Sequence, residues 1–390
     1  MAATTTSTAN SGTTANAQAA AAVVPFTIGS RIGSRNSFTL PGIALAADSP
    51  TTPPNTPVQL PAVGYVDSYL VEVTAALTGT GWTLGQSGVF GLIDHIALRN
   101  SQGQNLIVPL TGDELYLMNK YSGLGRGLAN PYGAQNDPKL DVTYTATGAT
   151  LHFFFYVPAV IDKISAFGAL PALASNRSYQ FEVVLSSISK AFGGTAPTAV
   201  SVSLDASAVF WQEPVGVTNG GGTQQTEPFG LGSIALWQKE VQNTAQGENL
   251  LRSNNVGNTL RNIIFIARDN TGARSESAWS PISELLVDNY PLIRLKDSEW
   301  RSAMGSWFGY SGTLDGAGGL DTGVRVVPFY LLAGGYSGDM NASHAQYLQT
   351  LDATLLQLHQ LQMGAAAAGG TLTILTQSVQ SDNQAFIFSK

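Results

Sequence analysis

The chain has 390 residues, and only 12% of them are Asp, Glu, Lys or Arg, about half the share of an average soluble domain. Its formal charge is −7 at pH 7, so it lacks the basic footprint of a nucleic-acid binder, and we expect no direct contact with nucleic acid. The absence of cysteine excludes disulfide frameworks, zinc–cysteine sites and thiol nucleophiles. A surface with so little charge, on a chain without a membrane-spanning run, predicts a subunit of an assembly whose neighbours cover much of it.

The first 60 residues differ in composition from the rest of the chain. Residues 1–22 are rich in Thr, Ser, Ala and Asn, and residues 48–61 contain five prolines. Such segments supply few large apolar groups and interrupt regular strands. We therefore expect an extended N-terminal arm over residues 1–60, with a disordered tail as the alternative for the first dozen residues.

Beyond the arm, the first half of the chain alternates short apolar runs with turn residues. The run Tyr65–Thr74 places aromatic and β-branched residues alternately with polar ones, which is the pattern of a half-buried strand. One short helix is expected at Gly112–Tyr121. Further strands are expected at Val89–Leu98, Asn105–Leu110, Asp141–Ala146, Leu151–Val157, Ser178–Leu185 and Val200–Trp211.

A Gly-rich break at Gly216–Gly222 divides the chain, and the same order of elements then begins again. Asp297 is expected to be the N-cap of a second short helix that runs to about Phe308, with Trp300, Met304, Trp307 and Phe308 packing on or near one face. Strands are expected at Ser233–Val241, Thr259–Ala267, Leu285–Leu295, Val324–Leu331 and Thr371–Val379. The repeated order predicts an all-β chain of two tandem domains, at residues 61–222 and 223–390.

One stretch, residues 347–363, fits two structures. Leu348, Leu351, Leu355 and Leu358 have helical spacing, whereas the residues from Leu356 to Met363 alternate as a strand with one bulge would. We favour a strand from about Ala353, with Gly364–Gly370 as the turn that follows it. A helix is the alternative.

A search for reactive sites finds no recognisable constellation. The four histidines, His95, His152, His344 and His359, are scattered and form neither an HExxH pair nor a zinc-like cluster with carboxylates. The chain also lacks a phosphate-binding GxxxxGK[ST] loop and a GxSxG nucleophile elbow. We therefore expect no catalytic residue, no metal site and no cofactor, and we expect that the protein is not an enzyme.

Several segments together resemble one protein family. They are VDSYLVEVTAALT at 66–78, LHFFFYVPAVIDK at 151–163, SYQFEVVLSS at 178–187, TLRNIIFIARDNTGAR at 259–274, LLVDNYPLIRLKDSEWRSAMG at 285–305 and TLTILTQSVQ at 371–380. In order and spacing this set is similar to the double jelly-roll major capsid proteins of tailless icosahedral DNA phages with an internal membrane, the tectivirus group. It covers most of residues 60–385, and no single segment is diagnostic.

The resemblance implies a fold and a function. It implies two tandem eight-stranded jelly rolls with short inserted helices, and homotrimers of near-hexagonal outline that tile a virion capsid assembled in the host cytoplasm. The implied partners are further copies of the chain, minor capsid or cement proteins and a penton protein, with the internal viral membrane as a further contact of the arm. On this reading the arm faces the interior through Val23, Val24, Phe26, Ile28, Arg31 and Arg35.

Two other classes remain as alternatives. A virion spike or lectin-like β-sandwich needs exposed aromatic residues that converge on one groove, whereas the six tryptophans fall mostly in or beside expected elements. A jelly-roll enzyme of the cupin type needs a His/Glu metal set, which the sequence does not show.

Overall fold

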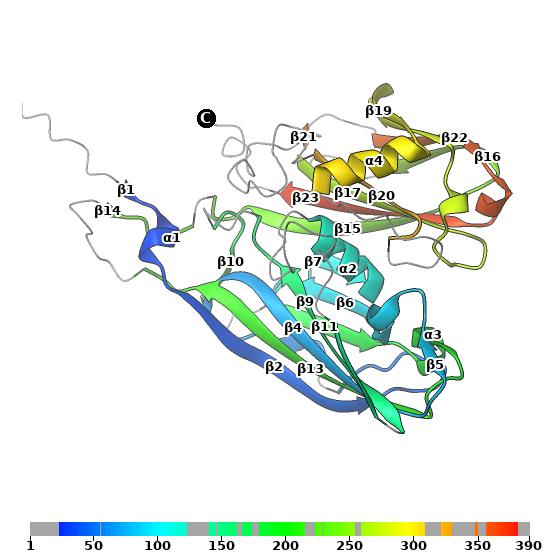
Figure 1. The fold of residues 1–390 in the computed structure, drawn as a ribbon. Coiled ribbons are helices and arrows are strands. Elements are labelled where there is room, and N and C mark those ends of the chain that lie inside the picture. Colours follow the sequence, from blue (N-terminus) through cyan, green and yellow to red (C-terminus); the bar gives the residue numbers. More distant parts are fainter. Residues whose placement is uncertain are drawn as a thin grey trace, which may run out of the picture.

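The computed structural model describes residues 23–54, 56–122, 140–145, 147–161, 166–173, 179–214, 223–228, 230–253, 259–308, 321–329, 348–349 and 356–380. These residues form two β-rich lobes side by side, the first built mainly from residues 32–214 and the second from residues 230–380 (Figure 1). The expected Gly-rich break at 216–222 lies outside the described residues.

The first lobe consists of two sheets that face each other. One sheet has the order β2-β13-β4-β9-β8, with the short β10 paired to β4, and the other has the order β7-β6-β11-β3. The strands of the first sheet are β2 (Ile32–Ala44), β13 (Ala199–Trp211), β4 (Gly64–Thr78), β9 (Gly148–Pro158), β8 (Leu140–Thr145) and β10 (Leu170–Ala172). Those of the second are β7 (Asn105–Leu110), β6 (Ile93–Arg99), β11 (Gln180–Leu185) and β3 (Val58–Gln59).

The second lobe has the same construction. One sheet has the order β20-β17-β23-β15, with the short β21 on β17, and the other has the order β16-β22-β18-β19. The first contains β20 (Val324–Pro328), β17 (Thr259–Arg268), β23 (Thr371–Gln380), β15 (Ile234–Asn243) and β21 (Leu348–Gln349). The second contains β16 (Gly247–Ser253), β22 (Leu356–Met363), β18 (Ile282–Val287) and β19 (Tyr290–Lys296).

The two lobes follow one strand order. If the principal strands of each lobe are numbered from one to eight along the chain, one sheet has the order first, eighth, third, sixth, and the other second, seventh, fourth, fifth. This order is that of a jelly roll. A helix follows the fifth strand in each lobe: α2 (Gly112–Tyr121) in the first and α4 (Asp297–Phe308) in the second. The expected fold of two tandem jelly rolls with short inserted helices is confirmed.

Smaller elements complete the described chain. Near the N-terminus β1 (Val23–Val24) pairs in parallel with β14 (Thr223–Gln224), and α1 (Phe26–Gly29) follows β1. The others are β5 (Trp82–Leu84), η1 (Gly88–Leu92), α3 (Ile188–Ala191), β12 (Phe192–Gly194), η3 (Glu276–Ala278) and η5 (Ala365–Ala367).

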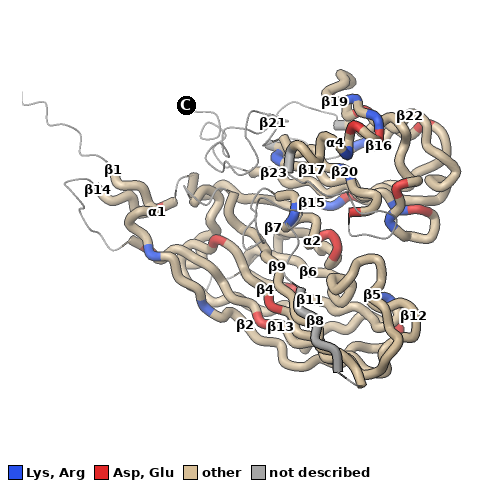
Figure 2. Tube along the Cα trace, in the orientation of Figure 1, with Lys and Arg blue, Asp and Glu red and all other residues tan. Residues whose placement is uncertain are grey.

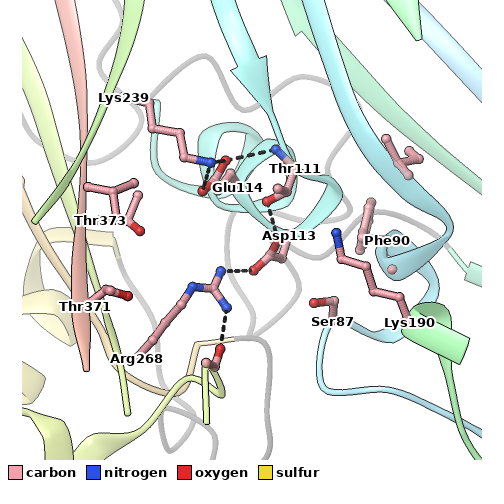
Figure 3. Close-up of a pocket in the computed structure, with 14 residues that line it drawn as sticks. Ser87, Phe90, Thr111, Asp113, Glu114, Lys190, Lys239, Arg268, Thr371 and Thr373 are labelled. Atoms are coloured by element: carbon pink, nitrogen blue, oxygen red, sulfur yellow. Dashed lines mark hydrogen bonds and ion pairs between the residues drawn. The ribbon is translucent and has the colours of Figure 1, made fainter. Parts of the chain in front are cut away.

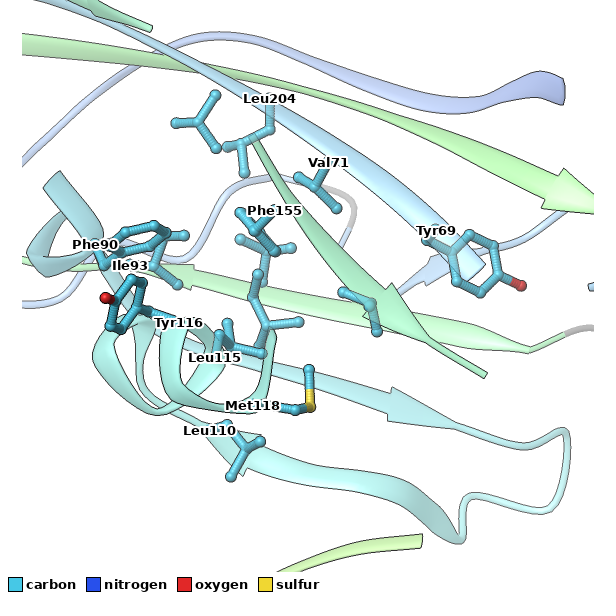
Figure 4. Close-up of a cluster of buried hydrophobic side chains, with 14 of the residues drawn as sticks. Tyr69, Val71, Phe90, Ile93, Leu110, Leu115, Tyr116, Met118, Phe155 and Leu204 are labelled. Carbon is cyan, nitrogen blue, oxygen red and sulfur yellow. The ribbon is translucent and has the colours of Figure 1, made fainter. Parts of the chain in front are cut away.

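The alternating strands build the hydrophobic core. In β9, for example, Leu151, Phe153, Phe155 and Val157 are buried, while the residues between them lie on the outward face and are half-buried. Figure 4 shows Phe155 and Val71 between the sheets, close to Leu115 of α2. This core extends into the second lobe, where it includes Trp237, Ile264 and Leu375. The two lobes therefore meet through buried side chains of this core, while the second lobe also has a separate cluster that includes Phe265 and Trp279.

The structure corrects several expectations. Residues 32–44 are not part of an extended arm, because β2 pairs with β13 from Ile32 to Ala44 and its Phe38 and Leu40 are buried in the core. The expected strand at 285–295 is a hairpin, because Asp288 and Asn289 adopt positive φ and turn β18 back into β19. The expected strand at Val89–Leu98 begins as the 3-10 helix η1. The sequence reading also missed β16.

The ambiguous region is a strand in its described part. β22 (Leu356–Met363) pairs with β16 and β18, as the strand reading expected, and β23 follows after the turn at Gly364–Gly370. Residues 350–355 lie outside the described residues.

Candidate functional site: the seam between the lobes

The helix α2 lies where the two lobes meet, and its N-terminus is fixed by the local sequence. Thr111 is the N-cap and Glu114 is the third helical residue, so that the Thr111 side chain accepts from the backbone of Glu114, while the Thr111 N–H donates to Glu114 Oε2 at 2.9 Å. All ten residues of α2 are buried, including its charged ones. A helix with charged residues buried on all sides needs partners for them.

The second lobe supplies those partners at the N-terminus of α2 (Figure 3). Arg268, at the end of β17, donates to Asp113 Oδ2 at 2.8 Å, and Lys239 of β15 lies 2.7 Å from Glu114 Oε1. Arg274 lies 3.9 Å from Asp113 and exchanges hydrogen bonds with Gln86 of the first lobe. These pairs join residues more than 120 positions apart in the chain, so they fix the lobes to each other.

The pKa of Asp113 shows that this network favours the ionised carboxylate. Burial by itself raises the pKa of Asp113, but the nearby Arg268 and Arg274 and the hydrogen bond from Thr111 outweigh it and lower the pKa from 3.8 to about 2. Burial also lowers the pKa of Arg274, against the attraction of Asp113. Asp113 is therefore a carboxylate at neutral pH and holds two guanidinium groups of the other lobe.

A second group of buried hydrogen bonds joins the C-terminal end of α2 to the second lobe. Lys120 donates to Asp321 Oδ2 at 2.5 Å, and the Tyr121 hydroxyl donates to Asp321 Oδ1 at 2.9 Å. The Asn262 amide of β17 donates to the Tyr121 carbonyl oxygen at 2.7 Å. Both ends of the helix are thus attached to the second lobe.

The contact between the two lobes, formed by α2 and its partners in the second lobe and here called the seam, also includes backbone pairing. Ile107 of β7 is the parallel partner of Trp237 of β15, which joins one sheet of each lobe into a single 9-stranded sheet. Charged residues are sparse over most of the chain, and in Figure 2 several lie between β15 and α2. The charges that the chain does carry are therefore partly used to hold the lobes together.

A cavity of about 320 Å³ opens beside the N-terminus of α2, but it offers no reactive group. Its charged lining residues are engaged in ion pairs: Asp113 with Arg268, Glu114 with Lys239, and Lys190 with Asp94. Among the described residues, no cluster of three or more His, Asp or Glu side chains could hold a metal ion. Within the same residues no helix is long and apolar enough to cross a bilayer. The contacts described above fix the two lobes in one orientation.

The structure places the expected arm contacts in different environments. Phe26 is buried, and its ring lies edge-on to Tyr65 at 5.1 Å, so it anchors the start of the described chain to the first lobe. Ile28, Arg31 and Arg35 are exposed, while Val24 is half-buried in β1. Val23 also lies in β1. Phe26 is thus a core residue here and is not free to contact a partner.

The expected helix residues lie in α4, with one shift. Asp297 was expected to be the N-cap and is the first residue of α4 in the structure; the Asp297 carboxylate accepts from Arg325. Trp300 and Met304 are buried as expected. Trp307 and Phe308 belong to the last turn of α4, and their side chains lie outside the described residues.

The seam residues themselves were not expected from the sequence. The Thr111-x-x-Glu114 pattern ahead of an apolar run was the available signal for the start of α2. Nothing local to Arg268 or Arg274 indicates that either one is buried against Asp113, because that contact depends on how the lobes pack.

Comparison with known proteins agrees with this geometry at the level of the fold. Neither a protein-family profile nor a curated protein sequence matches the chain. Solved structures of viral major capsid proteins do match, so the chain has the double jelly-roll fold that these proteins have.

Three of them show the extent of the likeness. The major capsid protein of STIV has a TM-score of 0.60 at 10% identity, over 90% of this chain and 97% of that one. The capsid of PBCV-1 virus has a TM-score of 0.54 at 12% identity, over 90% and 93%. The Faustovirus major capsid protein has a TM-score of 0.51 at 10% identity, over 90% of each chain.

Proposed function

We propose that this chain is the major capsid protein of an icosahedral virus, with a structural rather than a catalytic role. The observation that carries this proposal is the rigid pairing of two jelly rolls with one strand order. A subunit of two similar lobes in a fixed orientation presents nearly the same outline twice, so three subunits give six similar lobes. Such a particle can tile a closed shell through repeated, similar contacts.

The composition supports the same proposal. Only 12% of the residues are charged, and several of these form ion pairs between the two lobes. The outer surfaces of the lobes therefore carry little charge. A surface of this kind is better covered by another subunit than exposed to water. The fold shared with the capsid proteins of STIV, PBCV-1 and Faustovirus points in the same direction.

Finer features of the proposal rest on the sequence resemblance. We place the virus among the tailless phages with an internal membrane, the tectivirus group, with the protein in the virion capsid after assembly in the host cytoplasm. The first residues would face the interior, where the exposed Ile28 and Arg31 are available to the membrane or to minor capsid proteins. The proposed lobe boundary lies at residues 222 and 223.

Mass measurement under native conditions, followed by electron microscopy of the purified protein, tests the proposal. We expect a species of three times the chain mass with a near-hexagonal outline. A chain that stays monomeric at high concentration would contradict the capsid assignment. If such a monomer bound glycans on an array, the lectin-like alternative would replace it.

A further inference from the structure

The seam joins a strand at the edge of one sheet in the first lobe to a strand at the edge of one sheet in the second. Because the two lobes follow one strand order, each of these two strands has a counterpart in the other lobe. At the seam β7, the fifth strand of the first lobe, pairs in parallel with β15, the first strand of the second lobe. The corresponding strands are β19, the fifth strand of the second lobe, and β2, the first strand of the first lobe. In the described part of the chain, β19 and β2 are both edge strands with no partner on the outer side.

The segments β7–α2 and β19–α4 correspond residue by residue. Residues 105–121 align on 290–306 without a gap, so that Thr111 aligns with Lys296 and Glu114 with Glu299. The backbone N–H of Lys296 donates to Glu299 Oε2 at 2.7 Å, which repeats the bond from Thr111 to Glu114. In this alignment Ile107, the seam residue of β7, corresponds to Leu292.

The corresponding residues differ in what covers them. Ile107, whose strand pairs with β15 at Trp237, is 1% exposed, whereas Leu292 is 48% exposed. All ten residues of α2 are buried, but in α4 only Trp300 and Met304 are buried among the side chains described, at 297–306. The flank of the helix that the second lobe covers in α2 is therefore uncovered in α4.

The receiving surface also has a counterpart. In both lobes the third strand pairs with the sixth at a proline: Ser68 with Pro158 in the first lobe and Asn262 with Pro328 in the second. These two pairs are equivalent positions, and they align the strands of one lobe with those of the other. In this alignment, the pairing through the eighth strand makes Ser34 of β2 the counterpart of Trp237 of β15. Beside Ser34, Ile32 is 62% exposed.

The outward faces of the two sheets correspond as well. In the second lobe this face carries Ile264, Val324 and Val326, which are fully buried and belong to the core that the two lobes share. By the same register, the first lobe carries Leu70, Phe154 and Tyr156 at these positions. These three are only half-buried, so this face lacks the cover that its counterpart has.

The charges of the seam recur only in part at the outer ends: Glu114 corresponds to the exposed Glu299, but three others have neutral counterparts. By the same correspondences, Asp113, Lys239 and Arg268 are replaced by Ser298, Asn36 and Thr74. A contact that forms from two hydrated surfaces on association has to desolvate any charge it buries, and neutral residues avoid that cost. The three neutral replacements therefore lower the cost of burying these outer edges in a contact between separate chains.

We propose that β19 and α4 of one copy pack against β2 and the outward face of the sheet β2-β13-β4-β9 of a second copy. Leu292 then lies beside Ser34 and Ile32 of the neighbour, in the parallel arrangement that Ile107 and Trp237 have within the chain. The contact joins two different surfaces, so it is head-to-tail, and successive copies close into a ring when the rotation permits. This inference rests on the proposed trimer and names its interface.

Disulfide trapping tests the interface directly, because the chain contains no cysteine. A variant with Leu292→Cys and Ser34→Cys brings two thiols together only between copies, at the separation of neighbouring strands that a disulfide can bridge. Under oxidising conditions we expect a ladder of covalent dimers and trimers that ends at three chains. The matched control is Leu250→Cys with Ser34→Cys, since Leu250 lies on β16, at the other edge of the same sheet, and is 46% exposed.

A charge substitution gives an independent measurement. Leu292→Asp places a carboxylate in the proposed contact and should raise the concentration at which the trimer dissociates by roughly tenfold or more. Leu250→Asp, equally exposed, should leave that concentration unchanged. Both side chains are about half exposed, so neither variant should unfold the lobe, and circular dichroism checks this.

The outcomes separate this inference from the proposed function. If the unmodified protein is a trimer but the Leu292/Ser34 pair forms no covalent oligomer, or the control pair links equally well, the interface is wrong and the capsid proposal stands. If the protein is monomeric at every concentration, the capsid proposal fails as well.

Discussion

Removing the charge of Asp113 tests whether the seam holds the lobes together. The carboxylate is buried and faces Arg268 and Arg274 of the second lobe. A carboxyl whose pKa falls from 3.8 to about 2 on folding adds about 2 kcal/mol to the free energy of unfolding at neutral pH. Asp113→Asn keeps the shape of the side chain and loses this contribution.

The pH dependence gives the sign of the effect. Because the pKa of Asp113 is lower in the folded protein, its contribution is complete above about pH 4 and disappears as the pH falls through 2. The difference in unfolding free energy between the native protein and Asp113→Asn should therefore be about 2 kcal/mol at pH 7 and should shrink towards zero near pH 2. Urea unfolding followed by tryptophan fluorescence, at one fixed protein concentration, measures both values.

A matched substitution shows whether the effect belongs to the seam. Asp48→Asn removes an equal charge from an exposed position and should change the unfolding free energy by no more than about 0.5 kcal/mol. A difference for Asp113→Asn that stayed constant between pH 7 and pH 2, or that matched the Asp48 control, would refute the electrostatic account of the seam.

Two other substitutions test the packing around the seam and the N-terminal anchor. Gly112→Ala should lower the unfolding free energy by about 1–3 kcal/mol, because an added Cβ would lie 1.8 Å from the Phe90 carbonyl oxygen, whereas Gly364→Ala, which has room for a methyl group, should be nearly neutral in the same urea titration. Phe26→Ala should release the start of the described chain and speed proteolytic cleavage before residue 31, because it removes a ring that is 1% exposed and docked on Tyr65. Ile28→Ala, at a side chain that is 70% exposed, is the control, and equal cleavage rates for the two variants would show that Phe26 is not the anchor.

The elements that the sequence predicted best are those with strong local signals. The expected bounds of β7 and α2 are those of the structure, because a capping threonine, an acidic first turn and alternating apolar residues mark them within a few positions. The repeated order of strands and one helix in each half was also readable, and with the resemblance it led to two jelly rolls.

Elements without such signals were missed. β2 has only two buried residues among the largely exposed positions of an edge strand, so its composition resembles that of a loop. The hairpin β18–β19 reads as one apolar run, because its turn consists of the two residues Asp288 and Asn289 inside that run.

The sequence by itself determined the fold class of this protein: its low charge and lack of cysteine follow from its composition, and its alternating strands in two similar halves follow from the order of the residues. The tertiary structure decided how the halves meet. Asp113 and Arg268 lie 155 positions apart, and only the packing of α2 between the lobes brings them within 2.8 Å. Local patterns record which face of a strand or helix is apolar, but they carry no information on which distant element covers that face.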